Sequence, residues 1–98
     1  MTDNQKTICH KIADHYGEEH QMLKAVEEMA ELTQQIAKRI RMQYSVNAYA
    51  EELADAAIVL EQLEYLFAKA AYRSTMLDKY IDIKLNRQLE SMESENDE

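Results

Sequence analysis

Two short acidic patches contain the residues of this sequence whose types and spacing could do chemistry. The first is "EEMAEL", which includes Glu28 and Glu31, and the second is "EELAD", which includes Glu52 and Asp55. Residues three apart project from the same side of a helix, so two such helices packed side by side would direct four carboxylates at one space. A space lined by hard oxygen ligands suits Mg²⁺ or Mn²⁺, which bind carboxylates together with water and substrate phosphates.

The composition predicts that helices carry both patches. The 98 residues include one Gly and no Pro, so few residues would break a helix. We therefore expect an all-α chain with a single domain over residues 1–92 and a charged, frayed tail over residues 93–98. A domain this short exposes much of its surface unless it also buries area against a partner, so self-association is expected.

The spacing of apolar residues predicts four helices. They span about 3–16, 18–42, 48–71, and from Ser74 or Thr75 to about 92. Gly17 is expected to end the first helix, and Ser45 or Asn47 is expected to cap the third. The second and third helices each carry an apolar seam with steps of three and four residues, as in a helical bundle. These seams are Met22, Val26, Met29, Thr33, Ile36 and Ile40, and then Tyr49, Leu53, Ala56, Leu60, Leu63 and Phe67.

The two acidic pairs are expected to have different surroundings. Glu52 and Asp55 share a stripe beside the seam of a helix that is apolar most of the way round, and burying a carboxylate there requires a proton, a basic partner or a metal ion. Glu28 and Glu31 share a stripe with Lys24, away from the seam. Taken alone, that second stripe is best interpreted as a solvated face.

Together, "EEMAEL" and "EELAD" resemble the signature of the MazG-like nucleotide pyrophosphohydrolases of the all-α NTP pyrophosphatase superfamily, which is E-x-x-E, a spacer, and E-x-x-D. The stretches "YGEEHQMLKAVEEMAEL" and "IKLNRQLE" extend the resemblance over most of the chain. The resemblance implies a four-helix chain in a helical bundle completed by dimerisation, as a homodimer or a homotetramer. It also implies an enzyme that hydrolyses nucleoside triphosphates to the monophosphate and pyrophosphate with Mg²⁺, or with Mn²⁺.

The resemblance assigns roles to particular residues. Glu28, Glu31, Glu52 and Asp55 would bind the metal, and either Glu27 or Glu31 would accept the proton of the attacking water. Lys84 and Arg87, in the late basic motif, would bind phosphate, although ordinary surface ion pairs explain them equally well. Lys24 is a third phosphate candidate, but an ion pair with Glu28 along the helix is the better interpretation. Base contacts would come from Tyr16, His20, Gln21 and Asn47.

Charge and cysteine content narrow the function further. The net charge of -8 opposes binding to a nucleic-acid polymer. The single cysteine, the absence of a long apolar run and the lack of a signal-peptide core predict a soluble cytoplasmic protein without a membrane partner. A ferritin-like di-iron site is excluded because no histidine follows a Glu by three residues.

The alternative function is a non-catalytic acidic helical bundle with an interaction or regulatory role.

Overall fold

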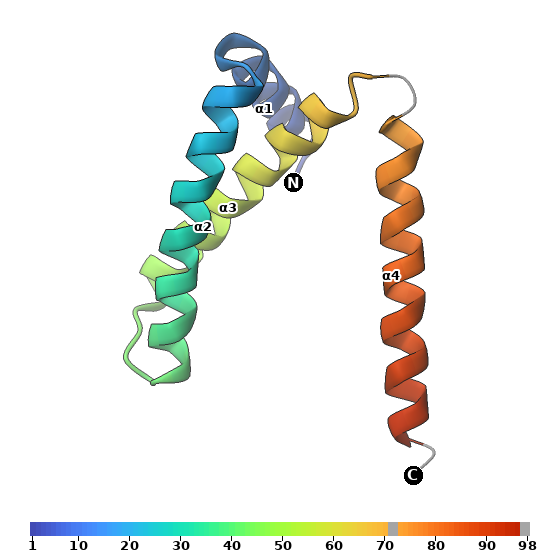
Figure 1. The fold of residues 1–98 in the computed structure, drawn as a ribbon. Helices are drawn as coiled ribbons and strands as arrows, with labels where there is room; N and C mark the ends of the chain where they lie inside the picture. Colours follow the sequence, from blue (N-terminus) through green and yellow to red (C-terminus); the bar gives the residue numbers. More distant parts are fainter. Residues whose placement is uncertain (71–72, 97–98) are drawn as a thin grey trace. The chain divides into compact units, whose positions relative to one another are not determined.

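The computed structural model describes residues 1–70 and 73–96, and these residues form four α-helices and no strand (Figure 1). The helices are α1 (Asp3–Tyr16), α2 (Glu18–Ile40), α3 (Val46–Phe67) and α4 (Arg73–Asn96). The all-α prediction is confirmed. Within this described part, no helix is both long and apolar enough to cross a membrane. The chain divides into two compact units, Met1–Leu66 and Phe67–Glu98.

Local capping explains where α1 begins and ends. Thr2 and Gln5 form a capping box, in which the Thr2 side chain accepts from the Gln5 backbone N–H and the Gln5 side chain accepts from the Thr2 backbone N–H. Gly17 ends the helix, as predicted, and its N–H donates to the Ala13 carbonyl over 2.8 Å. With φ 84° and ψ 171°, Gly17 has a conformation that side chains disfavour but that is not a left-handed helical one.

The connection from α2 to α3 begins with a helix end that the residue types do not signal, two residues before the predicted end at Met42. Met42 has a φ of 60°, and the N–H groups of Met42 and Gln43 donate to the carbonyls of Arg39 and Lys38. This is the Schellman pattern, here with Met rather than Gly in the left-handed position. Of the two predicted caps for α3, the structure uses Ser45, whose hydroxyl accepts from the Ala48 N–H.

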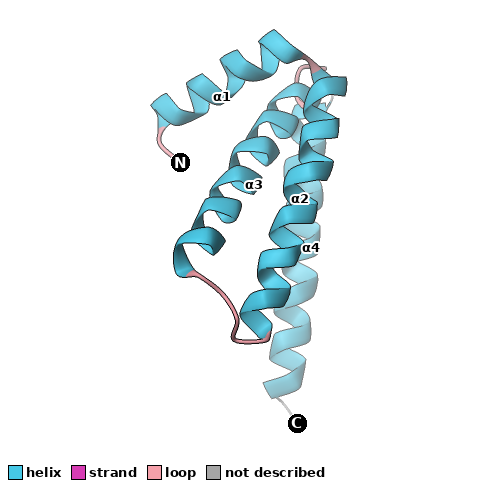
Figure 2. Ribbon diagram, turned by 90° about the vertical axis from the view of Figure 1, so that its left-hand side faces the viewer, coloured by secondary structure: helices cyan, strands magenta, loops and turns pink. Residues whose placement is uncertain are grey.

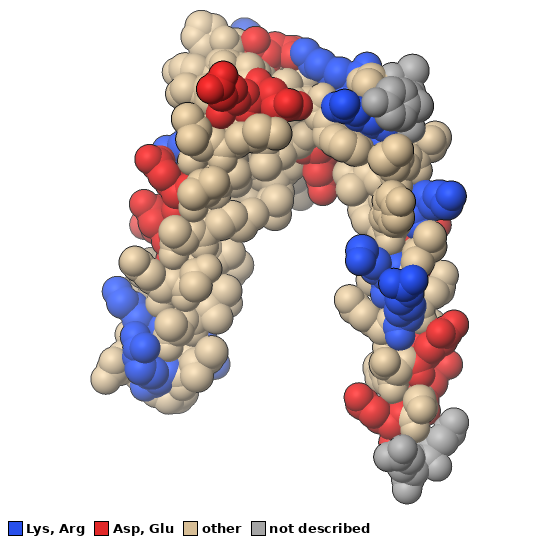
Figure 3. Space-filling view, viewed as in Figure 1, with Lys and Arg blue, Asp and Glu red and all other residues tan. Residues whose placement is uncertain are grey.

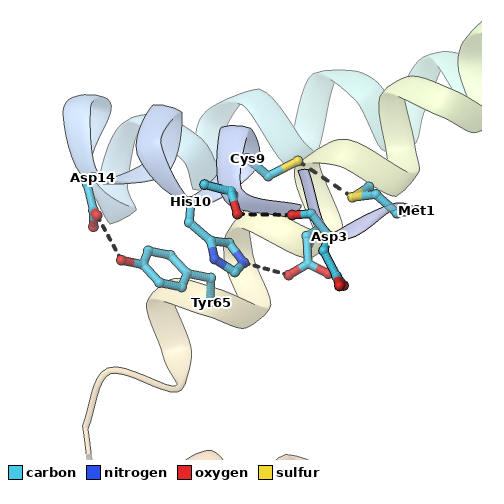
Figure 4. A network of polar contacts seen from close by, with 8 residues as sticks. Met1, Asp3, Cys9, His10, Asp14 and Tyr65 are labelled. Carbon is cyan, nitrogen blue, oxygen red and sulfur yellow. Dashed lines mark hydrogen bonds and ion pairs between the residues drawn. The ribbon is translucent and has the colours of Figure 1, made fainter. Parts of the chain in front are cut away.

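Polar contacts fix α1 against α3 (Figure 4). His10 Nε2 lies 2.9 Å from Glu61 Oε2, and the His10 ring stacks on Tyr65 with 4.0 Å between ring centroids. The Tyr65 hydroxyl donates to Asp14 Oδ2 over 2.7 Å. In each of the two hydrogen-bonded pairs the partners are 51 residues apart in the sequence, so these bonds hold the first helix of the unit on its last one.

Helices α2 and α3 run antiparallel and are joined by the loop that follows Ile40 (Figure 2). Apolar side chains, most of them small, fill the interior of the unit, and they are Cys9, Ala13, Ala25, Ala56, Val59 and Leu66. Three polar side chains are buried with them, namely Gln21, Glu28 and Gln62. An interior with this share of polar groups is unusual, because polar groups are costly to bury without partners.

The apolar seam predicted on the second helix does not face this interior. Val26 is 70% exposed and Ile40 is 76% exposed. The buried residues of α2 lie about a quarter of a turn away, and one of them, Glu28, belongs to the stripe that we expected to be solvated. That expectation was wrong for Glu28, which is buried. We use the name exposed seam for Met22, Val26, Ile36 and Ile40 on α2 together with Leu53 and Leu60 on α3.

The second unit contains α4, which extends further than predicted. The helix includes residues 93–96, the first four residues of the predicted tail, whereas residues 97 and 98 lie outside the described part. The predicted end of the third helix at Ala71 also lies outside it, and α3 ends at Phe67. Figure 3 shows basic side chains midway along α4 and acidic ones toward its C-terminal end.

Candidate metal centre

Helices α2 and α3 bring the four predicted metal ligands together. Glu28, Glu31, Glu52 and Asp55 each offer a carboxylate oxygen, and these four oxygens lie within 4.8 Å of one another. Each helix supplies a pair three residues apart, and the antiparallel packing of α2 on α3 places the two pairs opposite each other. The predicted convergence of the two acidic patches is therefore present in the structure.

The carboxylates differ in how far they are removed from water. Glu28 is 7% exposed and Glu52 is half-buried, whereas Glu31 and Asp55 are exposed. The buried oxygens Glu28 Oε2 and Glu52 Oε2 have no hydrogen-bond partner among the described residues. A buried carboxylate oxygen without a donor is costly, so these two atoms call for a cation or a proton.

Charge repulsion within the cluster changes how its acids titrate. Partial removal of its carboxyl group from water raises the pKa of Asp55, although the residue as a whole is exposed, and the nearby Glu28 carboxylate raises this pKa further. Burial likewise raises the pKa of Glu52, with Glu31 as the next cause. Asp55 thus interacts mainly with Glu28, and Glu52 with Glu31, in each case between α3 and α2. Without a cation, both pairs favour retention of a proton, which is the expected behaviour of carboxylates that share a site.

Lys24 provides partial compensation. Its Nζ lies 3.2 Å from Glu28 Oε1, one helical turn away, and about half of the Lys24 side chain is exposed. The ion pair and the neighbouring carboxylates raise the pKa of Lys24. The interpretation of Lys24 as a helical ion pair is confirmed, and this pair satisfies only one of the two Glu28 oxygens.

The ligand set fits a hard divalent cation. All four donors are carboxylate oxygens, and two of the side chains carry buried oxygens without partners. Mg²⁺ and Mn²⁺ prefer such oxygens and keep positions for water or phosphate, which the two exposed acids leave accessible. His10, His15 and His20 are not among the four residues of the cluster.

A cavity of about 590 Å³ adjoins the carboxylates. Glu28 and Asp55 lie in its wall, and so do Glu27 and Lys24. Three of the four predicted base-binding residues also line it, namely Tyr16, His20 and Gln21. Asn47 does not, because it lies exposed in the first turn of α3. The cavity therefore extends from the acidic cluster to an aromatic and amide end.

The aromatic and amide end of the cavity is built by contacts between neighbours. The Tyr16 and His20 rings stack, with 4.4 Å between their centroids and 15° between their planes. His20 Nδ1 lies 2.7 Å from Gln21 Oε1, and Gln21 Nε2 donates to Gln62 Oε1 over 2.6 Å. The sequence analysis missed Gln62. Its only signal was a place on the Glu52 and Asp55 stripe of α3, where a polar residue stands among apolar ones.

Two predicted phosphate ligands lie in the other unit. Lys84 and Arg87 are exposed residues of α4. Their role as phosphate ligands stays a prediction.

Comparison with known proteins adds no identification. No model of a known protein family matches the chain, and neither a curated protein nor a solved structure does. The resemblance to MazG-like enzymes therefore rests on the residues quoted above, and the chemistry of the site rests on its own geometry.

Proposed function

We propose that this protein is a Mg²⁺-dependent hydrolase that converts nucleoside triphosphates to the monophosphate and pyrophosphate. The observation that supports the proposal is the convergence of Glu28, Glu31, Glu52 and Asp55, with their oxygens within 4.8 Å of one another. Two of these acids also have buried oxygens without partners, and the cluster opens on a cavity lined by aromatic and amide side chains. A triphosphate with its base in that cavity would place its phosphates near the acids.

The residues of the cluster and the cavity would have different roles according to their exposure and position. Glu28 and Glu52, the less exposed pair, would hold Mg²⁺ most firmly, and Glu31 and Asp55 would complete the ligand set. When bound, the cation would neutralise the phosphates and let an anionic substrate approach an acidic site. Glu27 lines the cavity outside the four-carboxylate cluster, so it is free to accept a proton from water, and Glu31 is the other candidate.

A homodimer, or a tetramer built from dimers, is part of the proposal. The exposed seam lies on a different side of α3 from Glu61 and Tyr65, which contact α1. Apolar residues in a contiguous helical stripe lose contact with water most simply by packing against the same stripe of a second copy. Dimerisation would thus complete a bundle around α2 and α3.

The test is pyrophosphate release from a panel of nucleoside triphosphates with Mg²⁺, with Mn²⁺ and with EDTA. We expect metal-dependent release of pyrophosphate together with the matching monophosphate. Glu52→Gln should abolish turnover, because it removes a ligand while keeping the shape of the side chain. Glu64→Gln is the matched control, since Glu64 is an exposed acid of the same helix outside the cluster.

Three results would contradict the proposal. One is release of inorganic phosphate instead of pyrophosphate. Another is full turnover by Glu52→Gln with normal helicity in circular dichroism. The third is a folded, correctly assembled protein that hydrolyses none of the nucleotides, which would favour the non-catalytic interaction protein.

A further inference from the structure

A hydrogen-bonded relay connects the rim of the cavity to the interior of the first unit. It runs from His20 through Gln21 to Gln62, with distances of 2.7 Å and 2.6 Å. Gln21 and Gln62 are each only 3% exposed. Two amides are seldom placed this deep for packing alone, because apolar residues of similar size would fill the space at lower cost.

The relay has a direction because each amide has one accepting oxygen and one donating nitrogen. Gln21 Oε1 is bonded to the His20 ring, so His20 Nδ1 must donate. Gln21 then donates through Nε2, and Gln62 accepts through Oε1. The hydrogen bond from Gln21 occupies Gln62 Oε1, and Gln62 lines the cavity, which leaves its Nε2 group to meet a ligand. The group that the relay offers to a ligand is therefore a donor.

The Tyr16 ring fixes the plane of the His20 ring. Tyr16 stacks on His20, and the hydrogen bond to Gln21 Oε1 selects the ring orientation that places Nδ1 toward Gln21. The same aromatic pair lines the cavity that Gln62 reaches. A flat heterocycle could stack beside these rings and meet the Gln62 amide with its edge.

We propose that Gln62, oriented by His20 and Gln21, selects nucleobases by donating a hydrogen bond to a carbonyl oxygen of the base. Position 4 of a pyrimidine lies across the ring from the nitrogen that carries the sugar, so with the phosphates at the acids it is the edge directed toward the amide end of the cavity. Uracil nucleotides, which carry a carbonyl at position 4, are therefore favoured over cytosine nucleotides, which carry an amino group there and a carbonyl only beside the sugar-bearing nitrogen. The amino group would face the Gln62 donor without an acceptor, and an unmatched buried donor costs binding about tenfold or more. This inference rests on the proposed function for its substrate class, and it names a residue that determines specificity.

The first test compares binding, which does not require turnover. Calorimetry with Mg²⁺ would give dissociation constants for dUMP, for dCMP and for the analogue that carries hydrogen at position 4 of the pyrimidine. We expect dUMP to bind most tightly and dCMP most weakly, with at least about tenfold between them. Equal binding of dUMP and dCMP, or tighter binding of dCMP, would overturn the inference without any variant having to fold.

The second test changes the relay and follows the ratio of kcat/KM for dUTP to that for dCTP. Gln62→Glu presents an acceptor and should invert the ratio in favour of dCTP. Gln62→Met should bring it close to one, and His20→Phe, which keeps a ring against Tyr16, should also lower it because the direction of the relay is lost. Using a ratio cancels the general effect of an added charge near the acids. An unchanged ratio in Gln62→Glu would refute the role of Gln62.

The two proposals fail in different ways. If the protein binds dUMP in preference to dCMP but releases no pyrophosphate from any triphosphate, the base-reading relay stands and the proposed reaction falls. If pyrophosphate is released equally well from dUTP and dCTP, the reaction stands and the relay falls.

Discussion

Replacing Asp55 by Asn distinguishes two effects of the acidic cluster, which are charge repulsion without metal and the proposed binding of metal. The change keeps the size of the side chain and removes one negative charge from four carboxylates whose oxygens lie within 4.8 Å of one another. Without metal, partial removal of that charge from water and its repulsion by Glu28 oppose folding, as the raised pKa of Asp55 indicates. With metal, the same charge would be a ligand. The variant should therefore be more stable than the wild type without metal and less stable with it.

The magnitude follows from Coulomb's law. Two unit charges 4.8 Å apart repel by about 1 kcal/mol in a fully hydrated setting and by about 3.5 kcal/mol at an effective dielectric constant of about 20. Asp55 is exposed, so the lower value applies. A gain of about 1 kcal/mol raises Tm by about 4–8 °C in a domain of this size. Mg²⁺ at a hundred times its Kd would add about 2.7 kcal/mol to the wild type and little to the variant.

The dependence on pH supplies an independent check. The folded-state pKa of Asp55 is raised, so folding retains a proton that the unfolded chain releases. The wild type is therefore favoured at low pH, and it loses stability as pH rises from an ordinary carboxyl pKa near about 4 through the raised value. The advantage of Asp55→Asn should grow over that window and stay constant above it.

Thermal unfolding of wild type, Asp55→Asn and Glu64→Gln, with EDTA and with saturating Mg²⁺, would measure these effects. Glu64→Gln removes one acidic charge outside the cluster, so its Tm should follow the wild type in both conditions. Two results would refute the reasoning. One is a metal-free Asp55→Asn that is no more stable than wild type at pH 8, and the other is a variant that Mg²⁺ stabilises as much as it stabilises the wild type.

Two further predictions concern the metal and the assembly. Mg²⁺ affinity should rise with pH, and binding should release protons, because Glu52 and Asp55 have raised pKa values and must lose protons to act as ligands. Calorimetry in two buffers of different ionisation enthalpy would count the released protons, and a pH-independent affinity would contradict the site. Val26→Lys should raise the Kd of a dimer at least tenfold, because Val26 is 70% exposed in the exposed seam. Light scattering would show the shift toward monomer, with Gln34→Lys at another exposed position of α2 as the control. A monomeric wild type would contradict the dimer.

The sequence was sufficient for the helices and for the convergence of the acids. With one Gly and no Pro, its strongest stop signal is Gly17, and there the predicted and observed ends of α1 agree. The E-x-x-E and E-x-x-D spacings place each acidic pair on one side of a helix, and packing α2 on α3 then brings the pairs together. The end of α2 was harder to predict, because Met42 takes a left-handed conformation that its residue type does not signal.

The burial of Glu28 could not be predicted from apolar spacing. Spacing identifies the stripe with the most apolar residues, and on α2 that stripe is the exposed seam. The side that packs within the unit carries Gln21, Ala25 and Glu28, which no hydrophobic pattern would select. Which of two stripes faces inward depends on the contacts that α3 offers, and those contacts are non-local. The same limit applies to Gln62, whose importance appears only once Gln21 lies beside it.

In the first unit, polar side chains are buried while large apolar side chains are exposed. Polar groups occupy the interior between α2 and α3, where Gln21, Glu28 and Gln62 are buried, while large apolar side chains such as Val26 and Ile40 lie outside. An interior with these polar groups contributes little hydrophobic stabilisation, since that stabilisation scales with the apolar area removed from water. The exposed seam is the apolar area still available. Covering it with a second copy would stabilise the two helices that carry the acids without placing any apolar group in the cluster, so a homodimer would keep a polar centre and gain stability from association.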